Sequence, residues 1–117
     1  MKKMEAPKNS LRIMGRTGSA LQVIQLANNR KLAKVSLAVN EYFGTAGNQT
    51  KHTDWFNLLF WNDHVALAEQ LIKKGAAYQV EGRVRVNTYE GKDGVKHASI
   101  DVIVNEIEEV KHAPKEE

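Results

Sequence analysis

The sequence predicts an all-β fold, a small Greek-key barrel of five strands with one helix between the third and fourth strands. Five stretches alternate apolar and polar residues as strands do, and residues 63–74 have the spacing of an amphipathic helix. At 117 residues the chain can bury one core but not two. We therefore expect one domain at residues 9–110, after a flexible basic arm at residues 1–8 and before a frayed tail at residues 111–117.

The composition is that of an ordinary globular protein, with 42% hydrophobic and 26% charged residues. No apolar run approaches the roughly 20 residues that cross a membrane, and the first residues lack the hydrophobic region of a signal peptide. The absence of cysteine excludes disulfides, thiolate metal sites and a cysteine nucleophile. We therefore expect a cytoplasmic protein that does not bind membranes.

The first strand is expected to cover residues 9–26 and to bend sharply in its middle. Gly15 and Gly18 interrupt its alternation, and two glycines within one strand are typical of a corner in a small barrel. Neither a helical pattern nor a Gly-Lys-Ser/Thr sequence follows these glycines, which excludes a phosphate-binding loop.

The second strand is predicted by an alternation that puts Val35, Leu37 and Val39 on its inner face. Phe43 follows at the end of this strand with the same parity, so it is either a core residue or an exposed aromatic at the rim. Residues 44–52 are polar and contain glycine, which favours a long loop into the next strand.

The third strand, residues 53–61, is apolar on both faces. One face carries Phe56, Leu58 and Phe60, and the other carries Trp55, Asn57, Leu59 and Trp61. A buried tryptophan needs a partner for its indole N–H, and both tryptophans share their face with a polar residue. We therefore expect the phenylalanine face to fill the core and the tryptophans to stand about 20 Å apart as flat platforms that suit stacked bases. The alternative is that the tryptophan face contacts a second subunit or a covering element.

The fourth strand has the clearest alternation in the chain. Its inward residues are Tyr78, Val80, Val84 and Val86, and its outward residues are Gln79, Glu81, Arg83, Arg85, Asn87 and Tyr89. Asp93-Gly94 then predicts a two-residue hairpin turn into the fifth strand. The outward Ile103 and Ile107 of that strand would be exposed on so small a barrel, which favours a homo-oligomer.

This order of elements is typical of the oligonucleotide-binding barrel, in which single strands lie across the second and third strands. The net charge is only +3, but residues 1–36 carry eight Lys or Arg against Glu5 alone. A basic segment by itself is more often a solvated surface than a nucleic-acid site. The basic segment therefore counts only in combination with the aromatic face.

Several stretches also match the pattern of a known family. Residues 9–18, Asn-Ser-Leu-Arg-Ile-Met-Gly-Arg-Thr-Gly, resemble its opening Asn-x-hydrophobic-x-Leu/Ile-x-Gly-Asn-Leu-Gly. The other matching stretches are residues 34–38, 53–61, 71–75, 80–85 and 101–105. In their order and spacing, these stretches resemble bacterial single-stranded DNA-binding proteins.

The resemblance implies an oligonucleotide-binding fold that binds single-stranded DNA with little sequence preference in replication, recombination or repair. It also implies a homotetramer located at the nucleoid, with no enzyme activity, no metal and no cofactor. Aromatic side chains would stack on bases, and outward or basic-segment Lys and Arg would contact phosphates. The candidate DNA-binding residues are Trp55, Trp61, Tyr89, Phe43, Arg83, Arg85, Arg12, Arg16, Lys34 and Asn57.

Three departures from the family pattern bear on these expectations. Arg16 and Thr17 replace the usual Asn-Leu, and no acidic Asp-Pro pair follows Gly18, so we expect the bend to differ locally. The long glycine- and proline-rich tail with an acidic tip, which recruits replication and repair proteins in the family, does not follow residue 111. We therefore expect no tail-dependent partners, unless the sequence is truncated.

Other function classes have less support. The four histidines lack metal-ligand spacing and the serines lack a nucleophile motif, so we expect neither a metal site nor a catalytic site. One alternative is a primosomal-type interaction module that uses the same barrel mainly to dock protein partners. An RNA-binding barrel of the cold-shock type is less favoured, because nothing in the chain resembles the paired aromatic motifs of that family.

Overall fold

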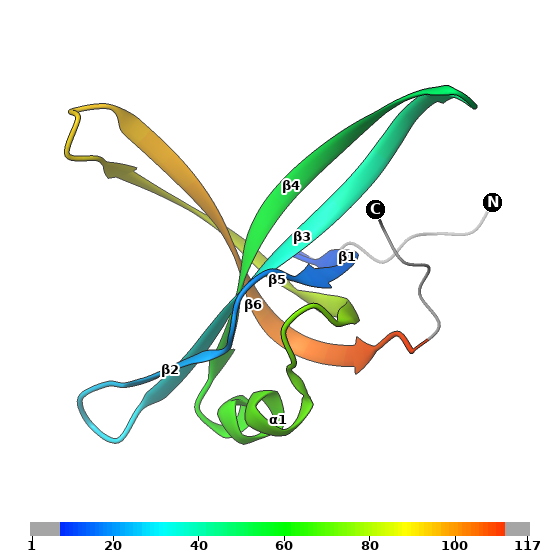
Figure 1. Ribbon diagram of the computed structural model, residues 1–117. Coiled ribbons are helices and arrows are strands. Elements are labelled where there is room, and N and C mark those ends of the chain that lie inside the picture. Colours follow the sequence, from blue (N-terminus) through cyan, green and yellow to red (C-terminus); the bar gives the residue numbers. More distant parts are fainter. Residues whose placement is uncertain (1–7, 112–117) are drawn as a thin grey trace.

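The computed structural model describes residues 8–111, so residues 1–7 of the expected arm and 112–117 of the expected tail lie outside the described residues. The elements are β1 (Leu11–Thr17), β2 (Gln22–Gln25), β3 (Lys31–Thr45), β4 (Asn48–Trp61), α1 (Asp63–Leu71), β5 (Ala77–Glu90) and β6 (Lys96–Glu109) (Figure 1). The strands are ordered β1-β5-β6-β4-β3-β2, and β1 also pairs with β3, which closes the barrel. Since β2 continues the first strand beyond its bend, the predicted five-stranded barrel with one helix is confirmed.

The predicted bend in the first strand lies between β1 and β2. Gly15 permits the close crossing of β1 over β3, because a Cβ at this position would lie 2.3 Å from the carbonyl oxygen of Ala38. Just after the crossing, the amide of Gly18 donates to the carbonyl oxygen of Ser36 at 3.0 Å. The glycines therefore let the first strand turn the corner while it stays bonded to β3.

The barrel interior holds most of the side chains that the alternation placed there. Those with at most 1% exposure include Val35, Leu37, Leu58, Phe60, Tyr78, Val80 and Val102. Phe56 and Val39 are partly buried against this cluster. Val86 was predicted to point inward and is 62% exposed, so this prediction is wrong. The reason is that β4 pairs with β6 only at residues 101–103, and beyond them β5 and β6 leave the barrel as a two-stranded ribbon.

Two hairpin arms extend from the barrel and diverge from each other (Figure 1). The predicted loop at residues 44–52 is wrong, because β3 and β4 stay paired as far as Thr45 and Asn48. The backbone N–H and C=O groups of the polar residues there form hydrogen bonds between β3 and β4. Gly47, with φ of 87°, lies in the turn that joins the two strands. The β5–β6 arm turns through residues 91–95 instead of the predicted two-residue turn. The radius of gyration is 16.3 Å, against about 13 Å for a compact domain of this length, as the extended arms require.

The helix α1 is shorter than predicted. It buries Val65 and Ala68 against the barrel but ends at Leu71, so Lys73 lies beyond it. The buried hydroxyl of Tyr78 accounts for the early end, since it donates to the carbonyl oxygen of Leu71 and accepts from the amide of Lys73, both at 2.8 Å. Burial raises the pKa of Tyr78. Among the described residues, no helix has the length and apolar character needed to span a membrane.

A β-bulge reverses the side-chain alternation of β6. The register between β5 and β6 passes over Asn105, so one extra residue of β6 is accommodated there. As a result, Ile107 packs against the core, and the expectation that it is exposed is wrong. Ile103 precedes the bulge and stays on the outward side, where it is half-buried. Of the two isoleucines that favoured an oligomer, only Ile103 keeps the predicted position.

Candidate nucleic-acid interface

The outward side chains of four neighbouring strands form one continuous surface, which we call the outer face. The register aligns them in cross-strand rows, in which Asp101 of β6 lies between Arg85 of β5 and Asn57 of β4. The outer face consists of Lys34, Ser36 and Ala38 of β3, Trp55, Asn57, Leu59 and Trp61 of β4, Asp101 and Ile103 of β6, and Arg83, Arg85 and Asn87 of β5. It is therefore polar at its centre and aromatic on β4.

The two tryptophans lie on the outer face, on the side of β4 opposite the buried Leu58 and Phe60. Trp55 is 57% exposed and its cross-strand neighbour is Ala38, whereas Trp61 is half-buried. Six residues of extended chain put them about 20 Å apart. Trp55 therefore offers a large accessible ring surface, and Trp61 offers a smaller one further along the same side of β4.

A carboxylate occupies the centre of the outer face. Asp101 accepts hydrogen bonds from the amide groups of Asn57, at 3.0 Å, and of Asn87. Since both amides direct an N–H to the carboxylate, their carbonyl oxygens remain as further acceptors. Among the described residues, neither Arg83 nor Arg85 forms an ion pair with it. Within the described residues, Asp101 is thus held by hydrogen bonds from two amides and not by an ion pair.

Tyr89 lies on the β5–β6 arm, on the same side of β5 as Arg83 and Arg85. It is 56% exposed, and its ring stacks on His97 with 5.4 Å between the ring centroids and 26° between the planes. The Nε2 atom of His97 lies 3.6 Å from a carboxylate oxygen of Asp93 in the turn of the arm. One side of Tyr89 is therefore backed by His97, which restricts the ring on an otherwise exposed arm.

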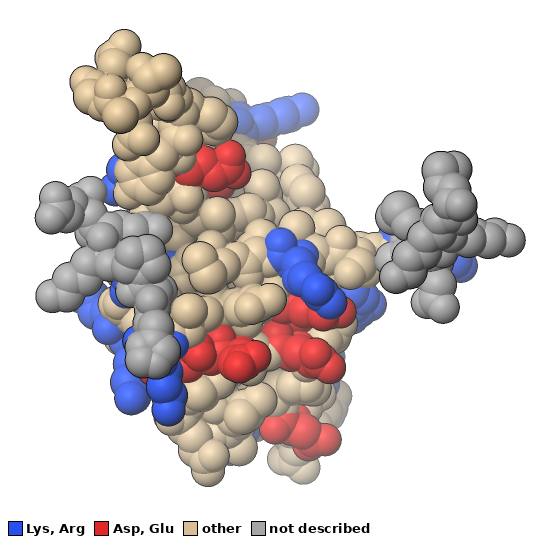
Figure 2. Space-filling view, turned by 90° about the vertical axis from the view of Figure 1, so that its right-hand side faces the viewer, with Lys and Arg blue, Asp and Glu red and all other residues tan. Residues whose placement is uncertain are grey.

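Two of the predicted basic residues lie away from the outer face. Arg12 of β1 pairs with Glu81 at 3.3 Å, in a groove also lined by Glu106 and Glu108. Figure 2 shows acidic side chains gathered on the side of the molecule at which β6 ends, with Lys and Arg around them. Arg16 donates to the carbonyl oxygen of Gly75 at 3.3 Å. The structure thus brings Lys34, Arg83 and Arg85 to the outer face but not Arg12 or Arg16.

The sequence of residues 8–110 matches the model of the Single-strand binding protein family. The chain belongs to this family. Membership argues for a binding protein rather than an enzyme. Within residues 8–111 there is no group of three or more His, Asp or Glu that could hold a metal ion.

The relatives of this chain include the single-stranded DNA-binding protein of Neisseria meningitidis. It is 29% identical over 100 residues, which make up 85% of this chain and 58% of the relative. The single-stranded DNA-binding protein of Xanthomonas campestris is 28% identical over 101 residues, which make up 86% of this chain and 59% of that one. The chain thus spans less than two thirds of the length of these relatives.

Two solved structures share the fold of this chain. A small single-stranded DNA-binding protein from Streptomyces coelicolor has a TM-score of 0.75 and 20% identity, with 91% of this chain and 97% of that chain covered. A Plasmodium falciparum SSB in complex with ssDNA has a TM-score of 0.72 and 22% identity, with 92% and 97% covered. At these identities the likeness establishes the barrel and not its contacts.

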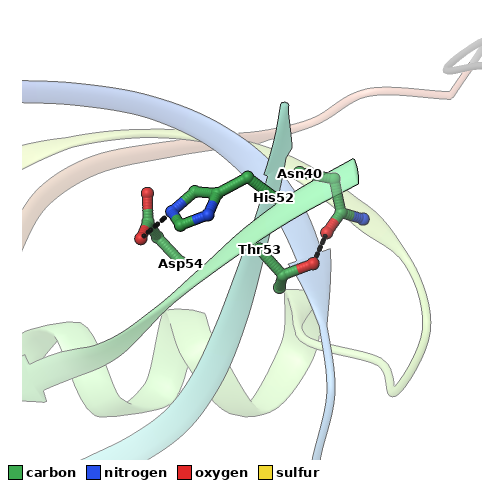
Figure 3. Close-up of polar contacts among 4 residues, drawn as sticks. All are labelled: Asn40, His52, Thr53 and Asp54. Carbon is green, nitrogen blue, oxygen red and sulfur yellow. Dashed lines mark hydrogen bonds and ion pairs between the residues drawn. The ribbon is translucent and has the colours of Figure 1, made fainter. Parts of the chain in front are cut away.

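The β3–β4 arm has two exposed sides. His52 and Asp54 interact at 3.0 Å on one side, while Thr53 donates to Asn40 at 2.6 Å on the other (Figure 3). Phe43 has the parity of the first side and is 54% exposed, so the alternative that it belongs to the core is wrong. Its parity agreed with the core, but the strand has left the barrel by that residue.

The side of this arm that carries Thr53 is continuous with the side of β4 that carries Trp55. Tyr42, which is 45% exposed, lies opposite Lys51 there, two residues beyond the pair of Asn40 and Thr53. An exposed aromatic and a cation next to the outer face are candidate contacts that our sequence reasoning missed. The two-residue alternation from Trp55 could have found Lys51, had residues 44–52 been read as strand instead of loop.

Proposed function

We propose that this chain binds single-stranded DNA with little sequence preference, at the nucleoid, and protects it in replication, recombination or repair. The observation that carries the proposal is the outer face, on which Trp55 and Trp61 offer aromatic surface beside Lys34, Arg83 and Arg85. Membership of the Single-strand binding protein family supports it. The alternative, a module that mainly docks protein partners, is not favoured by that membership.

Base stacking supplies the sequence-independent part of the affinity. Stacking on an aromatic side chain contributes about 1 to 3 kcal/mol per base, and every base has a π-face. Trp55, Trp61, Tyr89 and Phe43 all have accessible ring surface. Trp55 and Trp61 lie on the outer face and Tyr89 lies on the same side of β5 as Arg83, so one strand can meet these three rings in succession. Phe43 lies on the opposite side of the β3–β4 arm and would contact DNA separately.

The charges of the outer face favour one arrangement of the bound strand. Asp101 puts a negative charge at the centre, and like charges repel, so phosphates are disfavoured there. Lys34 and Arg83 lie at the two ends of one cross-strand row, with only Leu59 and Ile103 between them. Phosphates are thus attracted to the two sides of the face, and bases cover Leu59, Ile103 and the amide of Asn57 between them.

The proposed DNA-binding residues keep those named from the sequence and add two. Arg12 and Arg16 must first release Glu81 and the backbone at Gly75 before they contact phosphate, so we rank them below the others. The full set is Trp55, Trp61, Tyr89, Phe43, Arg83, Arg85, Arg12, Arg16, Lys34 and Asn57, with Tyr42 and Lys51 added from the structure.

We also propose that the chain forms a homo-oligomer, with the tetramer implied by the family resemblance. Among the described residues, β1 pairs with β5 along residues 11–16 but with β3 only at residues 16–17, so one edge of β1 is open over most of its length. Met14 on this strand is 51% exposed. Open edges and exposed apolar side chains are features that a second copy can cover.

A titration with oligothymidine tests the function and the stoichiometry together. Tryptophan fluorescence should be quenched as the strand stacks on Trp55 and Trp61, and native mass spectrometry should count subunits and strands in the complex. A matched RNA oligonucleotide distinguishes DNA binding from general single-strand binding. No quenching and no complex at micromolar protein in low salt would refute the proposed function, and a 13.1 kDa species alone would refute the oligomer.

A further inference from the structure

The ring of Trp55 rests against the bend between β1 and β2. A Cβ built on Gly18 would lie 2.6 Å from Cζ3 and 2.8 Å from Cη2 of the indole, both inside any normal contact distance. Gly18 does not have a positive φ, so its backbone could accept another residue. Glycine is therefore needed at position 18 because the benzo ring of Trp55 occupies the space that a side chain would fill.

The bend itself is held firmly to β3. The amide of Gly18 donates to the carbonyl oxygen of Ser36 at 3.0 Å, and the hydroxyl oxygen of Ser19 accepts from the amide of Ser36 at 3.1 Å and from its hydroxyl at 3.0 Å. Three hydrogen bonds thus tie two residues of the bend to one residue of the outer face. A methyl group on Gly18 would displace the exposed indole before it displaced this backbone.

A groove begins where the ring of Trp55 meets the bend. Its volume is about 530 Å³, and it is lined by the bend residues 19–22 together with Lys34, Val35, Ser36 and Asn57. Ser36 belongs to the groove and also lies 3.4 Å from the Cβ position of Gly18, so the groove and the ring are adjacent. This size falls within the roughly 300–1,000 Å³ of small-ligand clefts.

Lys34 gives the groove a cationic end. It lies four residues along β3 from Ala38, the cross-strand neighbour of Trp55, or about 13 Å at the rise of a strand. Among residues 8–111, no carboxylate lies within ion-pair distance of its ammonium group. An aromatic ring at one end and a free cation at the other are the groups that a stacked base and its phosphate require.

We propose that Gly18 is a positioning residue, which seats the ring of Trp55 as a fixed platform at the end of this groove, and that Lys34 holds a phosphate of the nucleotides stacked there. The inference rests on the proposed binding of single-stranded DNA. A ring that is already held loses less conformational freedom when a base stacks on it, so the seat raises affinity without touching the ligand. Restoring a Cβ at Gly18 frees the ring and lowers affinity.

A double-mutant cycle tests whether Gly18 acts through the indole. Gly18→Ala is compared in the parent and in Trp55→Phe, whose smaller ring keeps a π-face but lacks Cζ3 and Cη2. Alone, Gly18→Ala should weaken oligothymidine binding towards the 5- to 150-fold expected when about one stacked base is lost. In the Trp55→Phe background, Gly18→Ala should lower the affinity by less than about twofold, since the effects of substitutions at two interacting residues are not additive.

Two further readouts separate positioning from a general structural effect. With Trp61→Phe as background, Trp55 is the single tryptophan, and Gly18→Ala should make its fluorescence more accessible to acrylamide. Lys34→Gln should lower the salt dependence of binding by about 0.7 in log–log slope, with the fluorescence unchanged. An equal loss of affinity in both Trp55 backgrounds would overturn the role of Gly18, and so would unchanged binding by Gly18→Ala. Failure of the parent chain to bind would instead overturn the proposed function.

Discussion

Replacing Trp61 and Arg85 one at a time separates the two sources of DNA affinity. Trp61→Ala removes an aromatic surface at the end of β4, and Arg85→Ala removes a guanidinium from the row of Asp101 while every aromatic stays in place. Stacking depends little on salt, whereas a phosphate contact draws its free energy from released counterions. The two variants should therefore respond differently to salt.

Trp61→Ala is expected to change the affinity itself, and Arg85→Ala is expected to change the dependence of the affinity on salt. Trp61→Ala should weaken binding by about 1 to 3 kcal/mol, or about 5- to 150-fold, at every salt concentration. Arg85→Ala should lower the slope of log affinity against log salt by about 0.7, so between roughly 50 and 200 mM salt the ratio of parent to variant affinity should fall by about 2.6-fold. Arg85 is exposed and has no ion pair among the described residues, so stability should change by no more than about 0.5 kcal/mol.

Fluorescence titrations with one length of oligothymidine at several salt concentrations give both quantities, because Trp55 still reports binding in each variant. Lys74→Ala is a matched control, since this exposed lysine follows α1 and lies off the outer face, and its slope should equal that of the parent. A parallel shift for Arg85→Ala would refute its phosphate contact. If Trp61→Ala dissociates the oligomer and leaves the affinity per site intact, the tryptophans of the outer face form a subunit contact and the bases bind elsewhere.

Three other substitutions test separate parts of the structure. Gly15→Ala should destabilise the barrel by at least about 1 to 3 kcal/mol, because its Cβ would meet the carbonyl oxygen of Ala38, and an unchanged urea midpoint would contradict the close crossing. Tyr78→Phe should cost about 1 to 3 kcal/mol at pH 7, because two backbone groups lose their partner. It should also flatten the alkaline loss of stability: the raised pKa of Tyr78 makes its contribution complete below about pH 10 and lost as pH rises through the folded-state pKa, which urea unfolding between pH 8 and 11 would measure. Tyr42→Ala should weaken oligothymidine binding while the urea midpoint stays the same, and equal affinity would remove Tyr42 from the proposed path of the strand.

Side-chain alternation predicted the parts of the fold that lie within the barrel. Leu58 and Phe60 are buried and Trp55 is exposed as their parity requires, because one side of each barrel strand faces the core and the other does not. The same rule fails beyond the barrel. Phe43 and Val86 have inward parity and are exposed, since both sides of a two-stranded arm face solvent and parity there distinguishes nothing.

Contacts that depend on register between distant strands could not be read from the sequence. The bulge at Asn105 exists only in the pairing of β5 with β6, and it is what turns Ile107 towards the core. The ion pair of Arg12 with Glu81 likewise depends on how β1 aligns with β5. The resting place of the Trp55 ring on Gly18 joins segments 37 residues apart, so no local pattern reveals it.

The barrel is closed by a short seam. Direct pairing of β1 with β3 is limited to Arg16 with Ala38 and Thr17 with Leu37, whereas β4 is paired with β3 along its whole length. Short ladders open most readily in the local fluctuations of a native protein. Ala38, which pairs with Arg16 in this seam, is also the cross-strand neighbour of Trp55. Local opening of the barrel at the seam would therefore also separate Gly18 from the ring of Trp55. A ligand that needs this contact of Trp55 intact binds only the closed form, so by mass action it stabilises the short β1–β3 pairing.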